Sequence, residues 1–274
     1  MKRNDIFLTV GLVLTCALAL TAVLSFFWTP YVSTEIGAGA PFLAPCAEHL
    51  LGTDNFGRDL LSRVMEGMGA TFSIALLTTL LGTLLGVAVG APAGYFGGWA
   101  DELLMRFCDA FTAFPSVLLA LVFVSVFGRH GFSLFPDSRT NVIFALALVF
   151  MPSFARIVRG EFARARTLDY VRAARLMGAP HARVMFVHIL PNAAPVLLSS
   201  FAIGFNNAVL AESSMSFLGI GVEPPSASLG YMLSEAQGYL SRAPWYAIST
   251  GVAIALLTLG VGLIAEGLQR GGRR

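Results

Sequence analysis

Long hydrophobic stretches, separated by shorter polar ones, follow one another along the whole chain. Most are about as long as a helix must be to cross the hydrocarbon core of a bilayer, roughly 20 residues. None shows the alternating polar and apolar positions of a strand in a membrane barrel. The pattern predicts an all-α membrane protein with a single domain over 1–274. The six transmembrane helices that we expect span 6–28, 72–94, 103–127, 141–158, 193–210 and 245–268.

The first stretch can be either a membrane helix or a secretion signal. Lys2 and Arg3 precede it, as basic residues precede a signal. Its apolar run, 6–28, is longer than the about 7–15 residues of a signal core, and no small-residue cleavage site ends it. We therefore expect it to remain on the protein as the first transmembrane helix.

Composition supports a membrane protein and excludes other classes. Apolar residues make up 56% of the chain and charged residues 12%, and the mean hydropathy is +0.73. A soluble protein carries about a quarter charged residues, so intrinsic disorder and nucleic-acid binding are excluded. Cys16, Cys46 and Cys108 are odd in number and lack metal-ligand spacing, which indicates apolar packing residues rather than a disulfide or a metal site.

The placement of lysine and arginine predicts the orientation in the membrane. With the N-terminus inside, 13 of the 18 basic residues fall in cytoplasmic segments, and seven of these are arginines between Arg156 and Arg183. Cytoplasmic loops of membrane proteins carry an excess of basic residues. Both termini and the arginine-rich segment are therefore expected in the cytoplasm.

That arginine-rich segment, 167–191, lies between the fourth and fifth expected spans and has the pattern of a helical hairpin. Thr167 can cap a first short helix, and Gly178 can end it in a left-handed turn. Pro180 suits the first turn of a second short helix. We expect a small, stiff cytoplasmic hairpin on which another protein can push. Residues at helical spacing on one face of its first helix are Tyr170, Ala173, Ala174 and Met177.

Polar residues inside the expected spans are candidates for the pathway or for helix packing, because they are costly in lipid. Asn206 and Asn207 lie in the fifth span, and Glu212 lies at its outer end. We expect them to contact a neighbouring helix or an aqueous pathway. Arg106 and Asp109, one turn apart in the third span, form either a local ion pair or a functional one.

Two further patterns concern packing. Gly82, Gly86 and Gly90 recur every fourth residue, which lets another helix approach closely. Leu60–Met68 places its apolar residues opposite Arg63 and Glu66, which predicts a short helix lying on the outer membrane surface.

Common catalytic motifs are missing from the sequence. Lys2 is the only lysine, so a phosphate-binding Gly-Lys-Ser/Thr loop cannot exist in this chain. The histidines have no zinc-ligand spacing, and no Gly-x-Ser-x-Gly motif occurs. We expect a protein that is not an enzyme and has no catalytic residue, metal site or cofactor of its own. Active transport by this chain would have to draw its energy from elsewhere.

Several motifs, in order along the chain, resemble one family. Arg172-Ala-Ala, Gly178 and Leu190-Pro191 are similar to the coupling loop of permease subunits of binding-protein-dependent ABC importers, in the dipeptide, oligopeptide and nickel branch. Arg172 stands where the family has Glu. Two further blocks, 52–59 and 216–221, resemble outer-loop motifs of the same branch. The residues that carry these outer motifs are Gly52, Asp54, Gly57, Arg58, Asp59, Gly219 and Gly221.

The resemblance implies a permease subunit of the bacterial cytoplasmic (inner) membrane that forms half of a translocation pathway. Its partners would be a second homologous permease subunit, two ATP-binding subunits that hold ATP and Mg²⁺, and an extracytoplasmic substrate-binding protein. Its cargo would be dipeptides, oligopeptides, glutathione-like compounds, nickel or metal chelates such as metallophores. The residues expected to couple to the ATPases are Tyr170, Arg172, Ala173, Ala174, Arg175, Met177 and Gly178.

Two other classes of protein stay open. An ion-coupled secondary carrier should have paired broken helices and ionisable residues near the bilayer midplane, and this midplane is nearly uncharged. A membrane assembly protein would not need the cytoplasmic hairpin. Co-purification with an ATPase favours the importer, and uptake that an uncoupler abolishes while ATP stays high favours the carrier.

Overall fold

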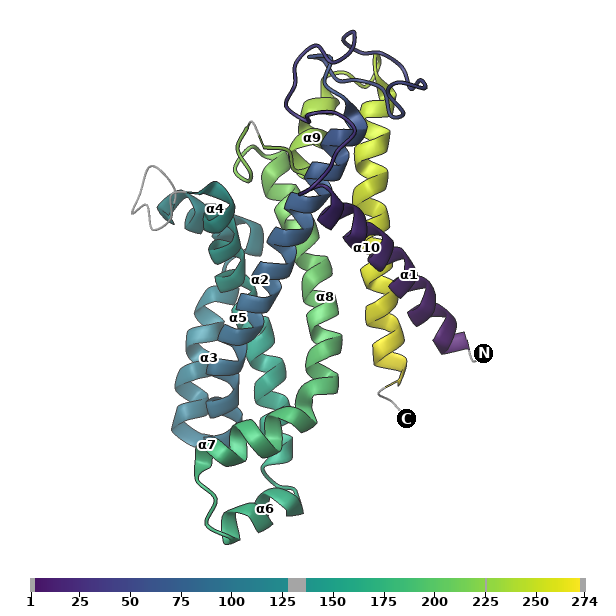
Figure 1. The fold of residues 1–274 in the computed structure, drawn as a ribbon. Helices are drawn as coiled ribbons and strands as arrows, with labels where there is room; N and C mark the ends of the chain where they lie inside the picture. The colour runs from purple at the N-terminus through teal and green to yellow at the C-terminus, as the bar shows by residue number, and fades with distance from the viewer. Residues whose placement is uncertain (1–2, 128–136, 225, 272–274) are drawn as a thin grey trace.

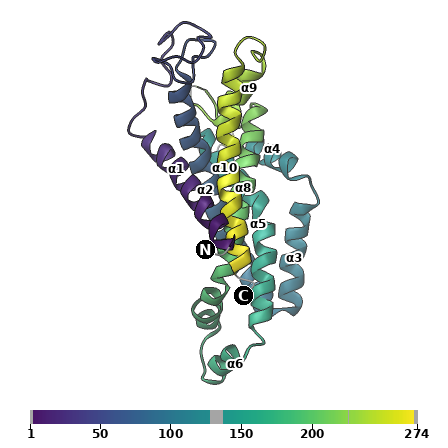
Figure 2. The same ribbon diagram turned by 90° about the vertical axis from the view of Figure 1, so that its right-hand side faces the viewer.

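The computed structural model describes residues 3–127, 137–224 and 226–271. Regular structure in these ranges is helical, apart from an isolated bridge between Thr53 and Asp59. The long helices form an elongated bundle (Figures 1 and 2). In chain order the helices are α1 (Arg3–Leu24), α2 (Leu60–Phe96), α3 (Gly98–Thr112), α4 (Ser116–Phe127), α5 (Ser138–Ala165), α6 (Asp169–Leu176), α7 (His181–Arg183), α8 (Leu190–Phe217), α9 (Leu229–Gln237) and α10 (Pro244–Gly271).

Five helical units are individually long and apolar enough to cross a membrane: α1, α2, α5, the unit from α7 through α8, and α10. A sixth span exists only if α3 and α4 are counted together, and they meet at 90°. The prediction of one continuous helix over 103–127 is therefore wrong. Pro115 lacks an amide proton and restricts the residue before it, Phe114, so the helix breaks there.

The helix α2 begins twelve residues earlier than the second expected span, at Leu60. Asp59 caps it, because its carboxylate accepts a hydrogen bond from the backbone N–H of Ser62 at 2.8 Å. Residues 60–68 are thus the first turns of a long helix, and the predicted separate surface helix is wrong. Arg63, expected on an exposed face, is 2% exposed.

The helical hairpin expected over 167–191 also differs from the prediction. Its first helix, α6, ends as expected at Gly178, whose φ of +79° is left-handed. Its second arm is not a separate short helix, because α7 continues through the π-helical turns Val184–Ile189 into α8. Thr167 does not cap α6, since its hydroxyl donates back to the carbonyl of Arg164 at 2.9 Å.

The glycine ridge on α2 packs against α5. A Cβ atom on Gly86 would lie 3.0 Å from the backbone nitrogen of Ala155, and one on Gly90 would lie 2.9 Å from Cβ of Val158. These spacings leave no room for a side chain. The predicted close helix approach is confirmed, and α5 is the partner that the sequence did not identify.

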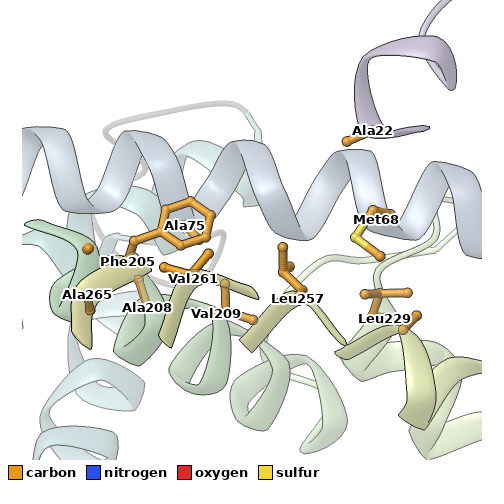
Figure 3. Close-up of a cluster of buried hydrophobic side chains, with 12 residues drawn as sticks. Ala22, Met68, Ala75, Phe205, Ala208, Val209, Leu229, Leu257, Val261 and Ala265 are labelled. Atoms are coloured by element: carbon orange, nitrogen blue, oxygen red, sulfur yellow. The ribbon is translucent and has the colours of Figure 1, made fainter. Parts of the chain in front are cut away.

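A buried apolar cluster fills the space where α2, α8 and α10 meet (Figure 3). Phe205 and Val209 of α8 lie beside Leu257 and Val261 of α10, and Ala75 of α2 covers them. Because lipid is itself apolar, close packing rather than the hydrophobic effect holds such helices together. This cluster ties α10 to the rest of the bundle.

The two ends of the bundle differ in character. The loops before α2 and the short helix α9 lie at one end, and α6 lies at the other (Figures 1 and 2). The start of α1 and the end of α10 both point towards the end that carries α6. The structure thus has an α6 end and a loop end, and the expected functional residues divide between them.

Candidate functional site

At the α6 end, the helix α6 presents an apolar outer surface. Leu176 is 89% exposed and Met177 is 81% exposed, and Ala173 is exposed beside them. Val171 and Ala174 point inward, where they join a buried cluster with Phe162 of α5 and Val184. Ala174 was expected on the docking face together with Tyr170, and that expectation is wrong for Ala174, which is 4% exposed.

The arginines of the hairpin have separate surroundings. The guanidinium of Arg175 lies 4.6 Å from the ring centroid of Tyr95, at the end of α2, and its Nε donates to the Tyr95 hydroxyl at 3.2 Å. The same hydroxyl lies 2.9 Å from Nδ1 of His181. Arg175 therefore contacts the end of α2, although the residue is also exposed to solvent. Arg172 is exposed, and the nearest carboxylate oxygen, of Asp169, is 3.9 Å away.

At the loop end, two of the predicted outer-loop motif residues, Asp54 and Arg58, belong to one largely buried charge network. The carboxylate of Asp54 is fully buried and accepts from Nε of Arg58 at 2.6 Å and from Nη1 of Arg63 at 2.6 Å. Glu235 of α9 lies 2.8 Å from Nη2 of Arg63. The hydroxyl of Tyr246, on α10, accepts from Arg63 at 2.9 Å and donates to Glu235 at 2.8 Å. The network therefore joins the start of α2 to α9 and α10.

The rest of that motif shapes the loop. Asp59 caps α2 and also lies 2.9 Å from Nδ1 of the buried His49. Gly52 has φ +80°, and a Cβ there would lie 2.8 Å from Nε1 of Trp245. Gly57 has φ +73°, and a Cβ there would collide with the carbonyl of Gly39. Both turns therefore need glycine.

Sequence reasoning missed Glu235, Tyr246 and His49. Glu235 is separated from Arg63 by 172 residues, so no local spacing could have linked the two. The one available signal was Arg63 itself, a charge among apolar residues. Burial raises the pKa of the Tyr231 phenol, which lies on the same short helix as Glu235.

Glu212 stabilises the second predicted outer-loop motif, residues 216–221. Its carboxylate is fully buried and accepts from the Ser216 hydroxyl at 2.7 Å, and that hydroxyl also accepts from the backbone N–H of Val222 at 3.3 Å. Gly219 has φ +78°, and a Cβ on Gly221 would collide with Ser216. Glu212 therefore holds a turn at the end of α8 and does not face an open pathway.

The two asparagines of α8 diverge. Asn207 lines a groove of about 340 Å³ between α3, α5 and α8, whereas Asn206 points towards Gly262 of α10. The side-chain oxygen of Asn206 is buried without a hydrogen-bond partner among the described residues. No charged residue of the described chain lines the groove. Its polar lining residues are Thr112, Ser116, Ser153, Ser200 and Asn207, set among phenylalanines.

Ion pairs join α3 to α5 beside this groove. Arg156 lies 2.9 Å from Asp109, and Arg159 lies 2.6 Å from Asp101. Arg106 lies 3.9 Å from Glu102 instead of pairing with Asp109. Of the two alternatives for Arg106 and Asp109, the local ion pair is therefore wrong, and the pairs between helices join α3 to α5.

A helical bundle with five to six helical units long and apolar enough to cross a membrane, and with a protruding short helix, defines a multi-pass membrane protein. Residues 82–274 match the model of a family described as binding-protein-dependent transport system inner membrane component. The chain belongs to this family, as the motifs had predicted.

The relatives define the branch of the family. The chain is 32% identical over 269 residues to the dipeptide transport system permease protein DppC of Alkalihalophilus pseudofirmus, covering 98% of this chain and 86% of that protein. It is 36% identical over 225 residues to the glutathione transport system permease protein GsiD of Pectobacterium atrosepticum, covering 82% and 72%. This chain is thus a permease subunit of an ABC importer of the peptide branch, in the bacterial inner membrane.

A solved structure has the same fold. A chain from inward-facing conformations of the MetNI methionine ABC transporter superposes with a TM-score of 0.62 at 17% identity, covering 78% of this chain and 98% of that chain. At this identity the likeness concerns the fold alone.

Proposed function

We propose that this chain forms half of the translocation pathway of an importer of short peptides, and that partner ATPases drive it through α6. The outward face of α6 carries the first part of the proposal. Leu176 and Met177 are large apolar side chains that are almost fully exposed on a polar hairpin. Burying each against a partner would contribute about 1.5–3 kcal/mol, which is enough to favour a stable contact.

The hairpin is built to pass movement on to the groove. Val171 and Ala174 of α6 pack against Phe162 of α5, and the second arm of the hairpin continues directly into α8. The same two helices, α5 and α8, line the groove that contains Ser153 and Asn207. A displacement of α6 would therefore tilt the helices that border the pathway, which is the requirement of alternating access between two states.

The lining of the groove suits a peptide. Hydroxyl and amide groups of Ser153, Ser200 and Asn207 can exchange hydrogen bonds with a peptide backbone, and the uncharged phenylalanine surroundings do not trap an ion. The names of the dipeptide and glutathione permeases agree with such a cargo. Nickel and metal chelates are the alternative cargo.

The full assembly would contain partners with separate tasks. A second homologous permease subunit would complete the pathway, two ATPase subunits would bind ATP and Mg²⁺, and an extracytoplasmic binding protein would deliver the cargo. No catalytic residue, metal or cofactor is assigned to this chain.

The test exchanges the apolar tip of α6 for charge. We expect the double variant Leu176→Glu, Met177→Glu to fold normally but to lose its co-expressed ATPase during purification and to lose ATP-driven dipeptide uptake in proteoliposomes. The matched control is Leu240→Glu, an exposed leucine in the short connection between α9 and α10, which should keep the ATPase bound. Full ATPase retention and uptake in the double variant would overturn the docking assignment.

The same proteoliposomes separate the alternatives. Uptake that needs ATP and survives an uncoupler supports the importer, and uptake abolished by the uncoupler while ATP stays high identifies a secondary carrier. If no uptake occurs although the co-expressed ATPase is present, the result points to an assembly protein. Competition by a nickel chelate but not by dipeptides assigns the alternative cargo.

A further inference from the structure

A second pocket lies on the inner side of the hairpin, away from the exposed tip of α6. Its volume is about 420 Å³. It lies between the end of α2, the residues that follow α5, and both arms of the hairpin. Three of its lining side chains are arginines, namely Arg166, Arg172 and Arg175, and its ring-bearing lining residues are Tyr95, Phe96 and His181.

The pocket has positive charge without matching acid. No carboxylate of the described chain lines it, and the one near Arg172, of Asp169, is 3.9 Å away on a fully exposed side chain. Two arginines of α5 that do not line the pocket do have acidic partners, since Arg159 pairs with Asp101 and Arg164 pairs with Glu161. A concentration of cations in a concave site attracts an anion.

The guanidinium of Arg166 lies against the backbone of the protein instead of beside an acidic side chain. Its guanidinium lies against Gly97, where a Cβ would collide with Nη1 and would lie 3.3 Å from Cζ. Gly97 also has φ +69°, so glycine is needed there on two counts. Among the described residues Arg166 has no carboxylate within ion-pair distance. Its donors are therefore free for a ligand.

The position of the pocket at the end of α2 indicates which class of ligand it binds. The helix α2, which is long and apolar enough to cross a membrane, ends at Phe96, which lines the pocket, and Phe96 and Trp99 are 54% and 78% exposed. Exposed aromatic side chains at the end of a span are typical of the interface between lipid tails and headgroups. Guanidinium groups match phosphate oxygens in geometry and charge, and basic pockets at this depth bind lipid headgroups.

We propose that this pocket binds a phosphate group, supplied by the headgroup of an anionic phospholipid of the inner leaflet. The bound headgroup would touch Arg166 at the end of α5 and Arg172 and Arg175 on α6 at once. It would therefore fix the position of the hairpin relative to the bundle. The outer face of α6, with Leu176 and Met177, would stay free for the ATPase.

The test measures lipid binding by the purified full-length chain with native mass spectrometry in detergent, using phosphatidylglycerol, phosphatidylcholine and inorganic phosphate as separate probes. We expect phosphatidylglycerol to bind and phosphatidylcholine not to bind. Arg166→Gln should weaken phosphatidylglycerol binding about fivefold, the loss expected for one arginine at a headgroup. Arg166→Lys should lose less affinity than Arg166→Gln, because a cation remains although the guanidinium geometry is lost.

The matched control is Arg183→Gln, which removes the same charge from an exposed arginine of the hairpin that does not line the pocket. It should leave the affinity unchanged, and an equal loss in both variants would refute a specific pocket. Binding of inorganic phosphate that depends on Arg166, without lipid binding, refutes the lipid source and assigns a soluble anion. Unchanged phosphatidylglycerol binding in Arg166→Gln overturns the proposal.

Thermal unfolding of each variant shows whether it is folded, and Arg166→Lys keeps the comparison decisive if Arg166→Gln is unstable. The binding assay needs no ATPase and no cargo. Failure of the pocket therefore leaves the docking of α6 intact, and failure of that docking leaves the pocket intact.

Discussion

The ion pair of Glu235 with Arg63 contributes to the stability of the loop end of the protein. Replacing it by glutamine keeps the shape of the side chain but removes its charge. Arg63, which is 2% exposed, then keeps only the carboxylate of Asp54, which Arg58 also contacts. Two guanidinium groups would share one carboxylate in a buried site. We expect Glu235→Gln to destabilise the protein.

The magnitude follows from the burial of the partners. Removing one partner of a fully buried ion pair costs about 3–5 kcal/mol. Glu235 is 16% exposed and Asp54 remains, so we expect a smaller loss, about 2–3 kcal/mol. Removing Arg63 as well, as Arg63→Gln, relieves the unmatched charge. The double variant should therefore lose about 1–3 kcal/mol less than the sum of the two single variants.

The assay is unfolding of the purified chain in mixed micelles with increasing denaturing detergent, followed by circular dichroism. Glu48→Gln is the control, since Glu48 is an exposed carboxylate in the outer loop, and it should change stability by less than about 0.5 kcal/mol. The reasoning is refuted if Glu235→Gln costs no more than this control. Additive effects of Arg63→Gln and Glu235→Gln would refute it as well.

Two further predictions concern packing. Gly90→Val should destabilise the bundle by about 1–3 kcal/mol in the same unfolding assay, because a Cβ atom there would lie 2.9 Å from Cβ of Val158. Gly251→Ala is the control and should not destabilise the protein, because a Cβ there would have no atom within 4 Å. Equal effects of the two variants would contradict the close packing of α2 on α5. Ala174→Leu should loosen α6 and speed its proteolysis, because Ala174 is buried. Ala173→Leu is the control and should not speed proteolysis, because Ala173 is exposed. Unchanged proteolysis of Ala174→Leu would show that Ala174 faces outward.

Several features of the fold could be predicted because their causes are local. Hydropathy located most of the helical spans, and the end of α6 followed from Gly178, since glycine adopts the left-handed turn at little cost. The spacing of Gly82, Gly86 and Gly90 predicted a close helix contact. The order of the motifs predicted the family.

Other features were misjudged although a local signal existed. Phe114-Pro115 marks the place where the third span breaks into α3 and α4, but hydropathy continues across it and conceals the bend. The start of α2 was placed too late because Arg63 and Glu66 interrupt the apolar pattern. Averaged hydropathy treats a neutralised charge and an exposed one alike.

The sequence by itself determined that the chain is helical, lies in a membrane and carries a short polar helix at a glycine turn. It could do so because apolar length, proline and glycine act within a few residues. Only the tertiary structure decided the surroundings of individual charges. Arg175 faces Tyr95, Arg63 is matched by Glu235, and Arg166 is left without an acid, because each depends on which distant helix lies beside it.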